Sequence, residues 1–387
     1  MPRPLTAIAR TLVAALAALI LCGCQPRAPL FIAGGPDAPQ VSPAALTRMG
    51  RALNLTESQR AQSADLYAAY AESHQRAARK YRDYQELAKK ILEKDPDAPR
   101  VAARRDDASV KFAAHTGALA DQFLEDLQLL LAREQLNNWE AALRALRRAR
   151  STGSAYAEKT ADLRQALEAA RPTTKPPRAA EIAATIDAWE RAVDPVLIRK
   201  ESFIRTTLAE NLRADREKDN DARTSLYRRW RLIVRDERVV TTRALRELLT
   251  LLPEDAATGL SRAVQERTYP WLYQNTETLE VLQRAAAIDN LSLDAKRRIA
   301  ELRAEYLRER LALADRTARD FEQWELSATD DEIAGADHPE PRPELIARFQ
   351  QSEGRTTKGL ADILTKAQLE SINASTITRD LPPFDLE

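Results

Sequence analysis

The sequence predicts an all-α protein built from long antiparallel helical hairpins. Glycine contributes only 10 of 387 residues, against an average usage of about 7%, which disfavours the glycine-rich turns of doubly wound α/β folds. Charged residues reach 30% and aromatic residues only 5%, which suits solvated helices better than sheets rich in β-branched and aromatic side chains. The 59 basic and 58 acidic residues nearly cancel, so no overall field indicates nucleic acid as a partner. The length itself favours two or three structural units.

Residues 1–23 have the pattern of an export signal. Arg3 and Arg10 flank the start of an uncharged apolar run that ends at Cys22-Gly23-Cys24, and the run is shorter than the roughly 20 residues of a membrane span. Leu21-Cys22-Gly23-Cys24 resembles the lipobox of bacterial lipoproteins, although a small or β-branched residue is usual where Cys22 stands. The resemblance implies cleavage before Cys24, acylation of that cysteine and stable anchoring by several acyl chains. An ordinary signal with incidental cysteines is the alternative.

The expected processing defines where the protein acts. Cys22 leaves with the signal and Cys24 carries lipid, so the mature chain keeps no thiol for disulfides, metal or nucleophilic catalysis. Gln25 stands where an Asp retains enterobacterial lipoproteins in the inner membrane, so it favours the outer membrane. We therefore expect a lipid-anchored protein on the periplasmic face of a bacterial membrane, with the outer membrane favoured over the inner.

Seven segments follow from composition and periodicity. Residues 24–45 are rich in proline and glycine and predict an extended tether. Beyond the tether, the helical periodicity and the Pro-rich stretch from Arg171 to Pro177 divide the chain into helical units and a linker. The segments are the signal peptide (1–23), the tether (24–45), a first helical unit (46–151), a short helix with a Pro-rich linker (152–177), a divergent second unit (178–277), a third unit (278–376) and a tail (377–387).

Each unit is expected to contain an outgoing and a returning helix. In the first unit an apolar stripe from Leu66 to Ile91 is interrupted at Asp95-Pro96-Asp97-Ala98-Pro99 and returns from Val101 to Leu130, and a shorter helix is predicted over 134–150. In the second unit the stripe runs over 182–204 and returns over 226–252 beyond a polar turn at 215–221. In the third unit it runs over 293–324, turns at 327–343 and returns over 344–364.

A repeated pentapeptide marks helix starts. Leu55-Thr56-Glu57-Ser58-Gln59 opens the first unit and Leu364-Thr365-Lys366-Ala367-Gln368 closes the third, while Leu131-Ala132-Arg133-Glu134-Gln135 occupies the closing place of the first. Thr can cap a helix, Leu packs just outside it, and a polar side chain three residues after the cap can reach back to the free N–H. This placement around long helical hairpins resembles the periplasmic LTxxQ-motif family of Spy-type and CpxP-type proteins. That family consists of small helical proteins, exported under envelope stress, that pair as thin curved dimers and hold unfolded clients without ATP.

Binding and metal sites have weaker signals. Tyr269-Pro270-Trp271-Leu272-Tyr273 is the best candidate for an exposed, partner-binding aromatic patch at Tyr269, Trp271 and Tyr273, with core packing as the alternative. His74 and His115 fall on the stripes of neighbouring helices, where they are packed rings, or else face each other as metal ligands or as a pH-sensitive pair. His338 lies in an acidic, Pro-rich turn. Arginine runs at 144–150 and 228–238 are solvated faces or contacts to an acidic partner.

The sequence predicts a binding protein rather than an enzyme. It contains no metal-protease, serine-hydrolase or phosphate-loop motif, and we expect no catalytic residue, no metal site and no cofactor. The leading hypothesis is an ATP-independent chaperone or envelope-stress protein held to the bilayer through Cys24. Its expected partners are the lipid bilayer, unfolded or envelope proteins and a second copy of the chain, but not nucleic acid. The alternative is a structural helical spacer or partner-binding scaffold of the cell envelope.

Overall fold

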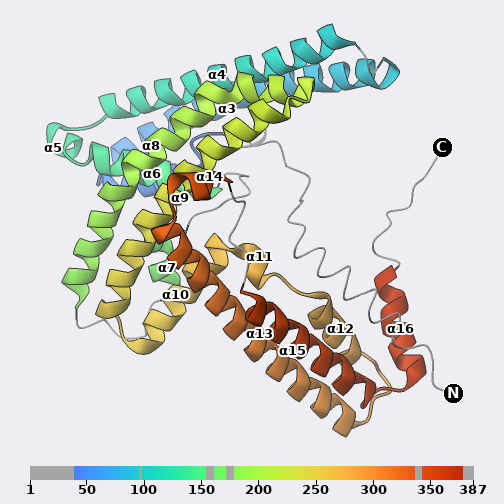
Figure 1. Ribbon diagram of the computed structural model, residues 1–387. Coiled ribbons are helices and arrows are strands. Elements are labelled where there is room, and N and C mark those ends of the chain that lie inside the picture. The colour runs from blue at the N-terminus through green and yellow to red at the C-terminus, as the bar shows by residue number, and fades with distance from the viewer. Residues whose placement is uncertain (1–38, 96–97, 154–160, 171–177, 336–341, 378–387) are drawn as a thin grey trace. The chain divides into compact units, whose positions relative to one another are not determined.

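The computed structural model confirms the all-α prediction. Helices make up 87% of the structure, and the described residues contain no strand (Figure 1). Within those residues, no helix combines the length and the apolar character that crossing a membrane requires. The structure describes residues 39–95, 98–153, 161–170, 178–335 and 342–377.

Consecutive long helices are separated from the next long ones by groups of shorter helices along the chain. The helices up to the end of the second long pair are α2 (Pro43–Ala52), α3 (Glu57–Lys94), α4 (Pro99–Leu129), α5 (Arg133–Leu136), α6 (Trp139–Gly153), α7 (Leu163–Ala169), α8 (Ala179–Glu217) and α9 (Asn220–Leu251). Those that follow are α10 (Glu254–Thr268), α11 (Pro270–Tyr273), α12 (Glu277–Ala286), α13 (Leu293–Ser327), α14 (Asp330–Gly335), α15 (Pro343–Ala361) and α16 (Lys366–Ile377).

The structure divides into two compact units, where three were expected. The first unit contains the described residues up to Ala257 together with residues 328–335, which include α14. The second unit contains residues 258–327 and 342–377. The two hairpins assigned to separate units over 46–151 and 178–277 therefore form one body.

Ion pairs between α6 and α8 explain why the first two hairpins join. Arg147 Nε lies 2.7 Å from Asp194 Oδ1, and Arg148 Nη2 lies 2.8 Å from Glu190 Oε1. The arginine run at 144–150 thus supplies internal contacts instead of a free basic surface. Because half-buried guanidinium–carboxylate pairs fix geometry as well as charge, they orient α8 against the first hairpin.

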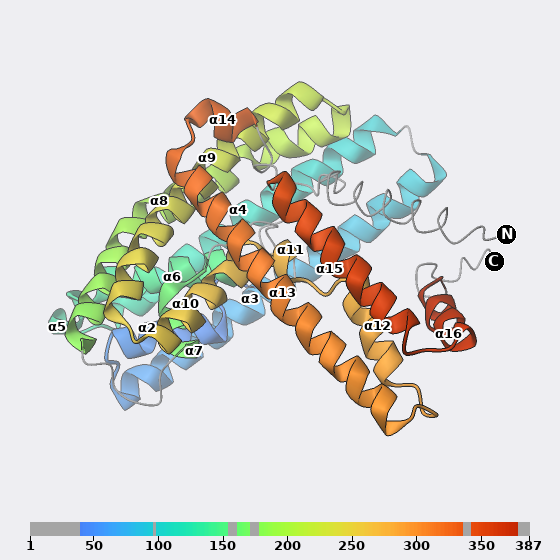
Figure 2. The ribbon, with the colours of Figure 1, turned by 60° about the horizontal axis from the view of Figure 1, so that its bottom comes forward.

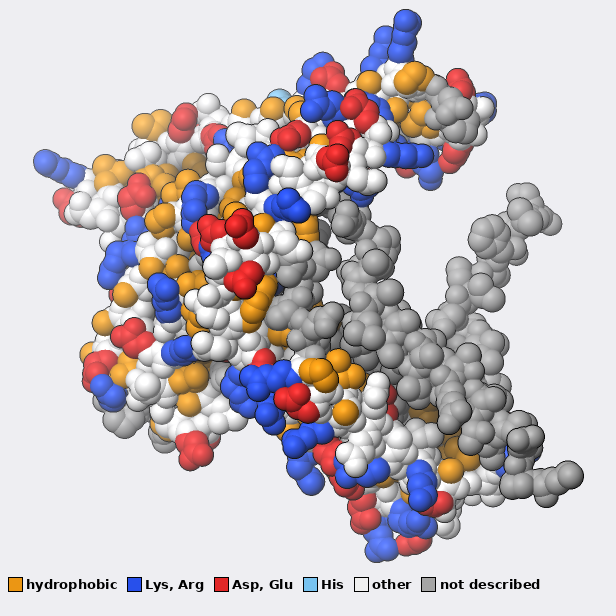
Figure 3. Space-filling view, in the orientation of Figure 1, with side chains coloured by type: hydrophobic (Ala, Val, Ile, Leu, Met, Phe, Trp, Pro, Cys, Tyr) orange, Lys and Arg blue, Asp and Glu red, His pale blue; other side chains and the backbone are white. Residues whose placement is uncertain are grey.

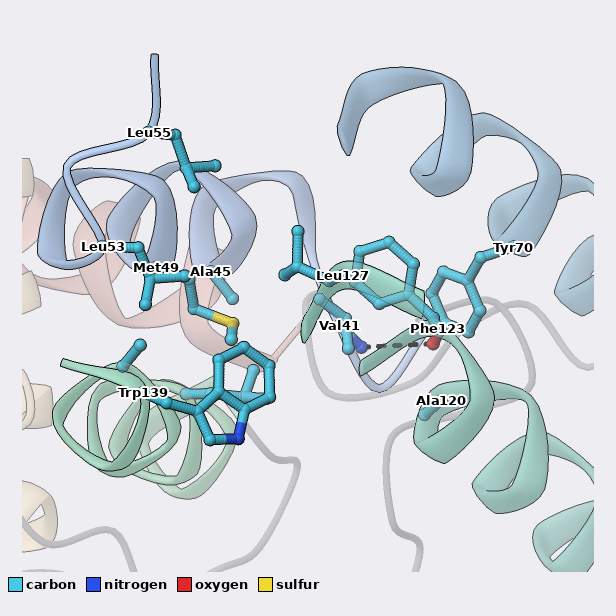
Figure 4. Close-up of a cluster of buried hydrophobic side chains, with 12 residues drawn as sticks. Val41, Ala45, Met49, Leu53, Leu55, Tyr70, Ala120, Phe123, Leu127 and Trp139 are labelled. Atoms are coloured by element: carbon cyan, nitrogen blue, oxygen red, sulfur yellow. Dashed lines mark hydrogen bonds between the residues drawn. The ribbon is translucent and has the colours of Figure 1, made fainter. Parts of the chain in front are cut away.

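The core of the first hairpin holds the end of the tether. Val41 is fully buried, and its N–H donates to the Tyr70 hydroxyl over 3.2 Å; the Ser42 side chain caps α2. Figure 4 shows Val41 between Met49 and the aromatic rings of Tyr70 and Phe123. The tether predicted for 24–45 therefore ends before Val41, because burial of an apolar side chain and an N-cap fix the chain there.

A buried ion pair joins α8 and α9. Lys200 and Glu237 are 2% and 3% exposed, and Lys200 Nζ lies 2.7 Å from Glu237 Oε2. Ser151 Oγ accepts a hydrogen bond from Lys200 over 3.0 Å, so the charge has several partners inside the protein. The turn between the two helices is made by Lys218 in the left-handed conformation with a φ of 54°.

In the second unit, α13 packs against α15 and α12 (Figure 2). The buried side chains of this unit's main cluster come from α12, α13, α15, the turn before α16 and α16 itself, and the Tyr306 hydroxyl lies 2.7 Å from Thr276 Oγ1. A smaller cluster contains Tyr269, Ala318 and Phe321. The buried members of the main cluster are Leu279, Leu282, Ala285, Ile299, Tyr306, Leu360, Leu364 and Ile372.

Candidate functional site

The two motifs of the first hairpin lie against each other at its open end, where α3 begins and α4 ends. Thr56 caps α3, and its N–H donates to Gln59 Oε1 over 2.9 Å. The N–H of Ala132 donates in the same way to Gln135 Oε1 over 2.8 Å, although alanine offers no capping oxygen of its own. Each glutamine thus caps the start of its own helix from within.

The same two glutamines also bond to each other. Gln59 Nε2 donates to Gln135 Oε1 over 2.7 Å, and Gln135 Nε2 donates to Gln59 Oε1 over 2.9 Å. The remaining amide hydrogens go to the carbonyls of Leu130 (2.7 Å) and Asn54 (3.1 Å). We call this arrangement the glutamine clamp. Both amides use two donors and two acceptors, so the clamp has little capacity left to bind a ligand.

The leucines of these motifs belong to the core. Leu55 is buried, and Leu131 packs against the same cluster. The clamp therefore closes the open end of a long hairpin through both apolar and polar contacts. The motif pair is a structural device that holds α3 and α4 in register.

Among the described residues, the motif of the second unit has no glutamine partner of this kind. The N–H of Thr365 donates to Gln368 Oε1 over 2.9 Å, and the N–H of Gln368 donates back to Thr365 Oγ1 over 3.3 Å; Leu364 is buried. At the start of α13, Ser292 caps the N–H of Ala295 over 3.1 Å. Ala295 stands where the second glutamine would be, so this unit caps its helix without a clamp.

An open groove of about 560 Å³ runs along the α3–α4 hairpin beyond the clamp. Tyr81 and Phe112 form its floor as a stacked pair with ring centroids 4.5 Å apart, and the Tyr81 hydroxyl lies 2.9 Å from Ser109 Oγ. Among the described residues that line the groove, none is acidic. The lining residues are Ser73, Arg76, Ala77, Lys80, Tyr81, Tyr84, Ala108, Lys111, Phe112, His115 and Leu119.

The cations of the groove differ in how they are paired. Arg76 contacts Glu72 over 2.6 Å and Lys111 contacts Asp107 over 2.7 Å, in both cases on the same helix, and the hydrogen bond that Lys111 donates to Asp107 raises the pKa of Lys111. Lys80 has no carboxylate partner among the described residues. Since exposed pairs of this kind are weak, a ligand with carboxylates can compete for all three cations.

The histidines do not form a metal site in the part of the chain that the structure describes. His74 is buried, with its ring beside Tyr70 and Phe112, whereas His115 is exposed and lines the groove. No cluster of three metal-ligating side chains occurs among the described residues. His338 and Cys24 lie outside them.

The predicted aromatic patch at Tyr269, Trp271 and Tyr273 is not an exposed surface. Tyr269 is buried, and its hydroxyl donates to Glu325 over 3.1 Å; Trp271 packs edge-on against it. The Tyr273 hydroxyl donates to Asp315 over 2.9 Å, and burial together with this bond raises its pKa. Core packing prevails because each hydroxyl finds a carboxylate partner inside the unit.

Comparison with known proteins gives no relative. The chain matches no family model, no curated protein and no solved structure. The resemblance to the LTxxQ-motif family therefore rests on the motifs themselves.

Three features of the first unit escape inspection of the sequence. The groove joins side chains from two helices, although Tyr81, Tyr84 and Phe112 were all assigned to apolar stripes. The link between Gln59 and Gln135 spans 76 residues, and only the repeated pentapeptide hinted at it. The Lys200–Glu237 pair has no local signal at all.

Proposed function

We propose that this protein is a lipid-anchored periplasmic binding protein that holds unfolded or partly folded envelope proteins without ATP, using the groove of the α3–α4 hairpin. The observation that carries the proposal is the lining of that groove, which combines stacked aromatic rings with three cations and no carboxylate among the described residues. Unfolded chains expose aromatic and apolar side chains together with acidic ones, and a shallow open surface accepts many sequences.

The clamp supports this proposal mechanically. A long hairpin that exposes part of its inner face loses burial there, so contacts at its open end must help to hold the two helices together. The Gln59–Gln135 bonds and the buried Leu55 supply that connection. The hairpin can then keep an open groove without separating.

The proposed anchor is Cys24, which lies 15 residues before Pro39, the first described residue. Replacing Cys24 with Ser is expected to release the protein from membrane fractions of the producing bacterium. Retention in those fractions, with acyl chains still found by mass spectrometry, would contradict the anchor.

Client binding is tested by suppression of aggregation. Mature protein should suppress light scattering by a chemically unfolded client at near-stoichiometric ratio without ATP. Ala108→Glu and His115→Glu place carboxylates in the groove and are expected to weaken suppression severalfold. Ala68→Glu, an exposed position on α3 outside the groove, is the matched control. Equal activity of all the variants, or none in the wild type, would rule out the groove.

A rigid spacer or scaffold is the second candidate. It is favoured by the polar groups of the clamp and of α6 and α8, which bond to other groups of the protein and so stiffen it. In that case the protein would show no client activity. Cross-linking in intact cells would then capture one stoichiometric envelope partner.

A further inference from the structure

The outer part of α3 carries an apolar ridge that begins at Tyr84 in the groove and continues past it to Leu87 and Ile91. Tyr84, Leu87 and Ile91 are 36%, 57% and 40% exposed, and their spacings of three and four residues place them on one face of the helix. Exposed leucine and isoleucine side chains on a stripe are unusual for a solvated helix end. We call these three residues the distal ridge.

Lysines extend the same stripe at both ends. Lys80 precedes Tyr84 by four residues and Lys94 follows Ile91 by three, so both project from the face of the ridge. Neither has a carboxylate partner among the described residues. Figure 3 shows Lys and Arg side chains beside hydrophobic ones at the outer end of this hairpin.

The composition of the hairpin end is basic as a whole. From Arg76 to Lys111 there are 11 Lys and Arg residues against 7 Asp and Glu. A helix face with an apolar centre and long basic side chains beside it fits a bilayer interface, because the apolar side chains enter the headgroup region while the lysines extend to the phosphates.

Other faces of the hairpin are already occupied. α4 packs against α8, where Asp106 pairs with Arg216. The buried Ala78 and Ala88 lie on α3 away from the solvent. The distal ridge is thus a side of the hairpin that the first unit leaves open.

The proposed lipid anchor brings a bilayer within reach of the ridge. Fifteen residues from Cys24 to Pro39 span at most about 50 Å when extended. The structured chain is held at Tyr70, which the N–H of Val41 contacts, and the 21 residues from Tyr70 to Ile91 span about 32 Å of helix. The anchor therefore permits the hairpin to lie along the membrane surface.

We propose that the distal ridge, together with Lys80 and Lys94, docks the first hairpin on an anionic phospholipid bilayer. A ridge suits a bilayer better than it suits a polypeptide, because Leu87 protrudes and a fluid interface closes around it. The inference uses the anchor of the proposed function to explain access, but the docking itself needs no acyl chain.

The test is flotation of the unacylated mature protein, made with Cys24→Ser and otherwise complete, with two kinds of vesicle. One contains phosphatidylethanolamine and phosphatidylglycerol at about three to one, and the other contains phosphatidylcholine alone. The protein should float with the anionic vesicles and not with the neutral ones. Added salt should weaken the binding, because it screens the lysines.

Substitutions identify the surface. Lys94→Glu should lower the vesicle partition coefficient at least about fivefold, and the double variant Leu87→Ser/Ile91→Ser about tenfold or more; all three residues lie outside the groove lining. Leu129→Ser, at a leucine that is 84% exposed at the other end of α4, and Lys366→Glu in the second unit should bind as the wild type does. Circular dichroism checks that each variant is folded.

The two proposals fail separately. No preference for anionic vesicles, or an equal loss in ridge and control variants, overturns docking on the membrane. If the ridge variants instead lose only suppression of client aggregation, the ridge belongs to the polypeptide site and the membrane inference is wrong. Vesicle binding without client activity removes the proposed function and leaves the docking surface in place.

Discussion

Removing the amide of Gln59 tests the glutamine clamp. In Gln59→Ala, four hydrogen bonds of the side chain are lost, two of them to Gln135 and one each to Leu130 and Thr56. A net hydrogen bond contributes about 0.5–1.5 kcal/mol, and water can replace some partners at this half-buried site. We therefore expect the free energy of unfolding of the first unit to fall by about 2 kcal/mol.

A double-mutant cycle isolates the contact across the hairpin. Gln135→Ala should cost a similar amount, and Gln59→Ala/Gln135→Ala should cost less than the sum of the two single changes. The difference measures the two bonds between the side chains, about 1 kcal/mol. Urea unfolding followed by circular dichroism gives these values, and hydrogen exchange at the N–H groups of Thr56 and Ala132 reports the clamp directly.

Gln368 provides a matched control, because its amide caps α16 through Thr365 alone. Gln368→Ala should cost about 1 kcal/mol or less. If Gln59→Ala costs no more than this control and the cycle gives no coupling, then the glutamine pair contributes nothing across the hairpin and the reasoning is refuted.

Three further predictions concern stability and are measured by urea unfolding. Lys200→Met should cost about 3–5 kcal/mol because it leaves Glu237 buried without a counter-charge, and adding Glu237→Leu should restore most of this; an equally unstable double variant would contradict that reason. Burial raises the pKa of Glu353, whose carboxylate accepts from Thr278, so its ionisation opposes folding as pH rises above the unfolded value of about 4.5. Glu353→Gln should therefore gain stability relative to the wild type between pH 4 and pH 7, and a difference that does not change with pH would count against this. Lys218→Gly should stabilise the protein by about 0.5–1 kcal/mol because the φ of 54° favours glycine, and a loss of stability would show that the lysine side chain matters there.

Local sequence signals were sufficient for the long helices. The stripes that predict helices before and after Asp95-Pro96-Asp97-Ala98-Pro99 correspond to α3 and α4, and those on either side of 327–343 correspond to α13 and α15. Thr56 and Thr365 cap their helices as the pentapeptide predicts. Periodicity and capping are properties of neighbouring residues, so the sequence states them directly.

Tertiary contacts decided which helices belong together. The sequence offers Arg147 and Arg148 as a basic run, and only the packing of α6 on α8 shows that carboxylates of α8 bind them. The sequence likewise leaves open whether Tyr269 is buried or exposed. Its hydrogen bond to Glu325 in the tertiary structure shows that it is buried.

The sequence by itself determined that this protein is helical and which segments form its long helices, and it predicts an export signal with a lipobox-like end before them. The tertiary structure alone decided that the first two hairpins form one unit, that Gln59 meets Gln135, and that the groove and the distal ridge stay open. The physical reason is the separation along the chain between the residues that interact. Helix periods and caps act within a few residues, whereas ion pairs, the clamp and exposed surface depend on residues that are far apart in the chain.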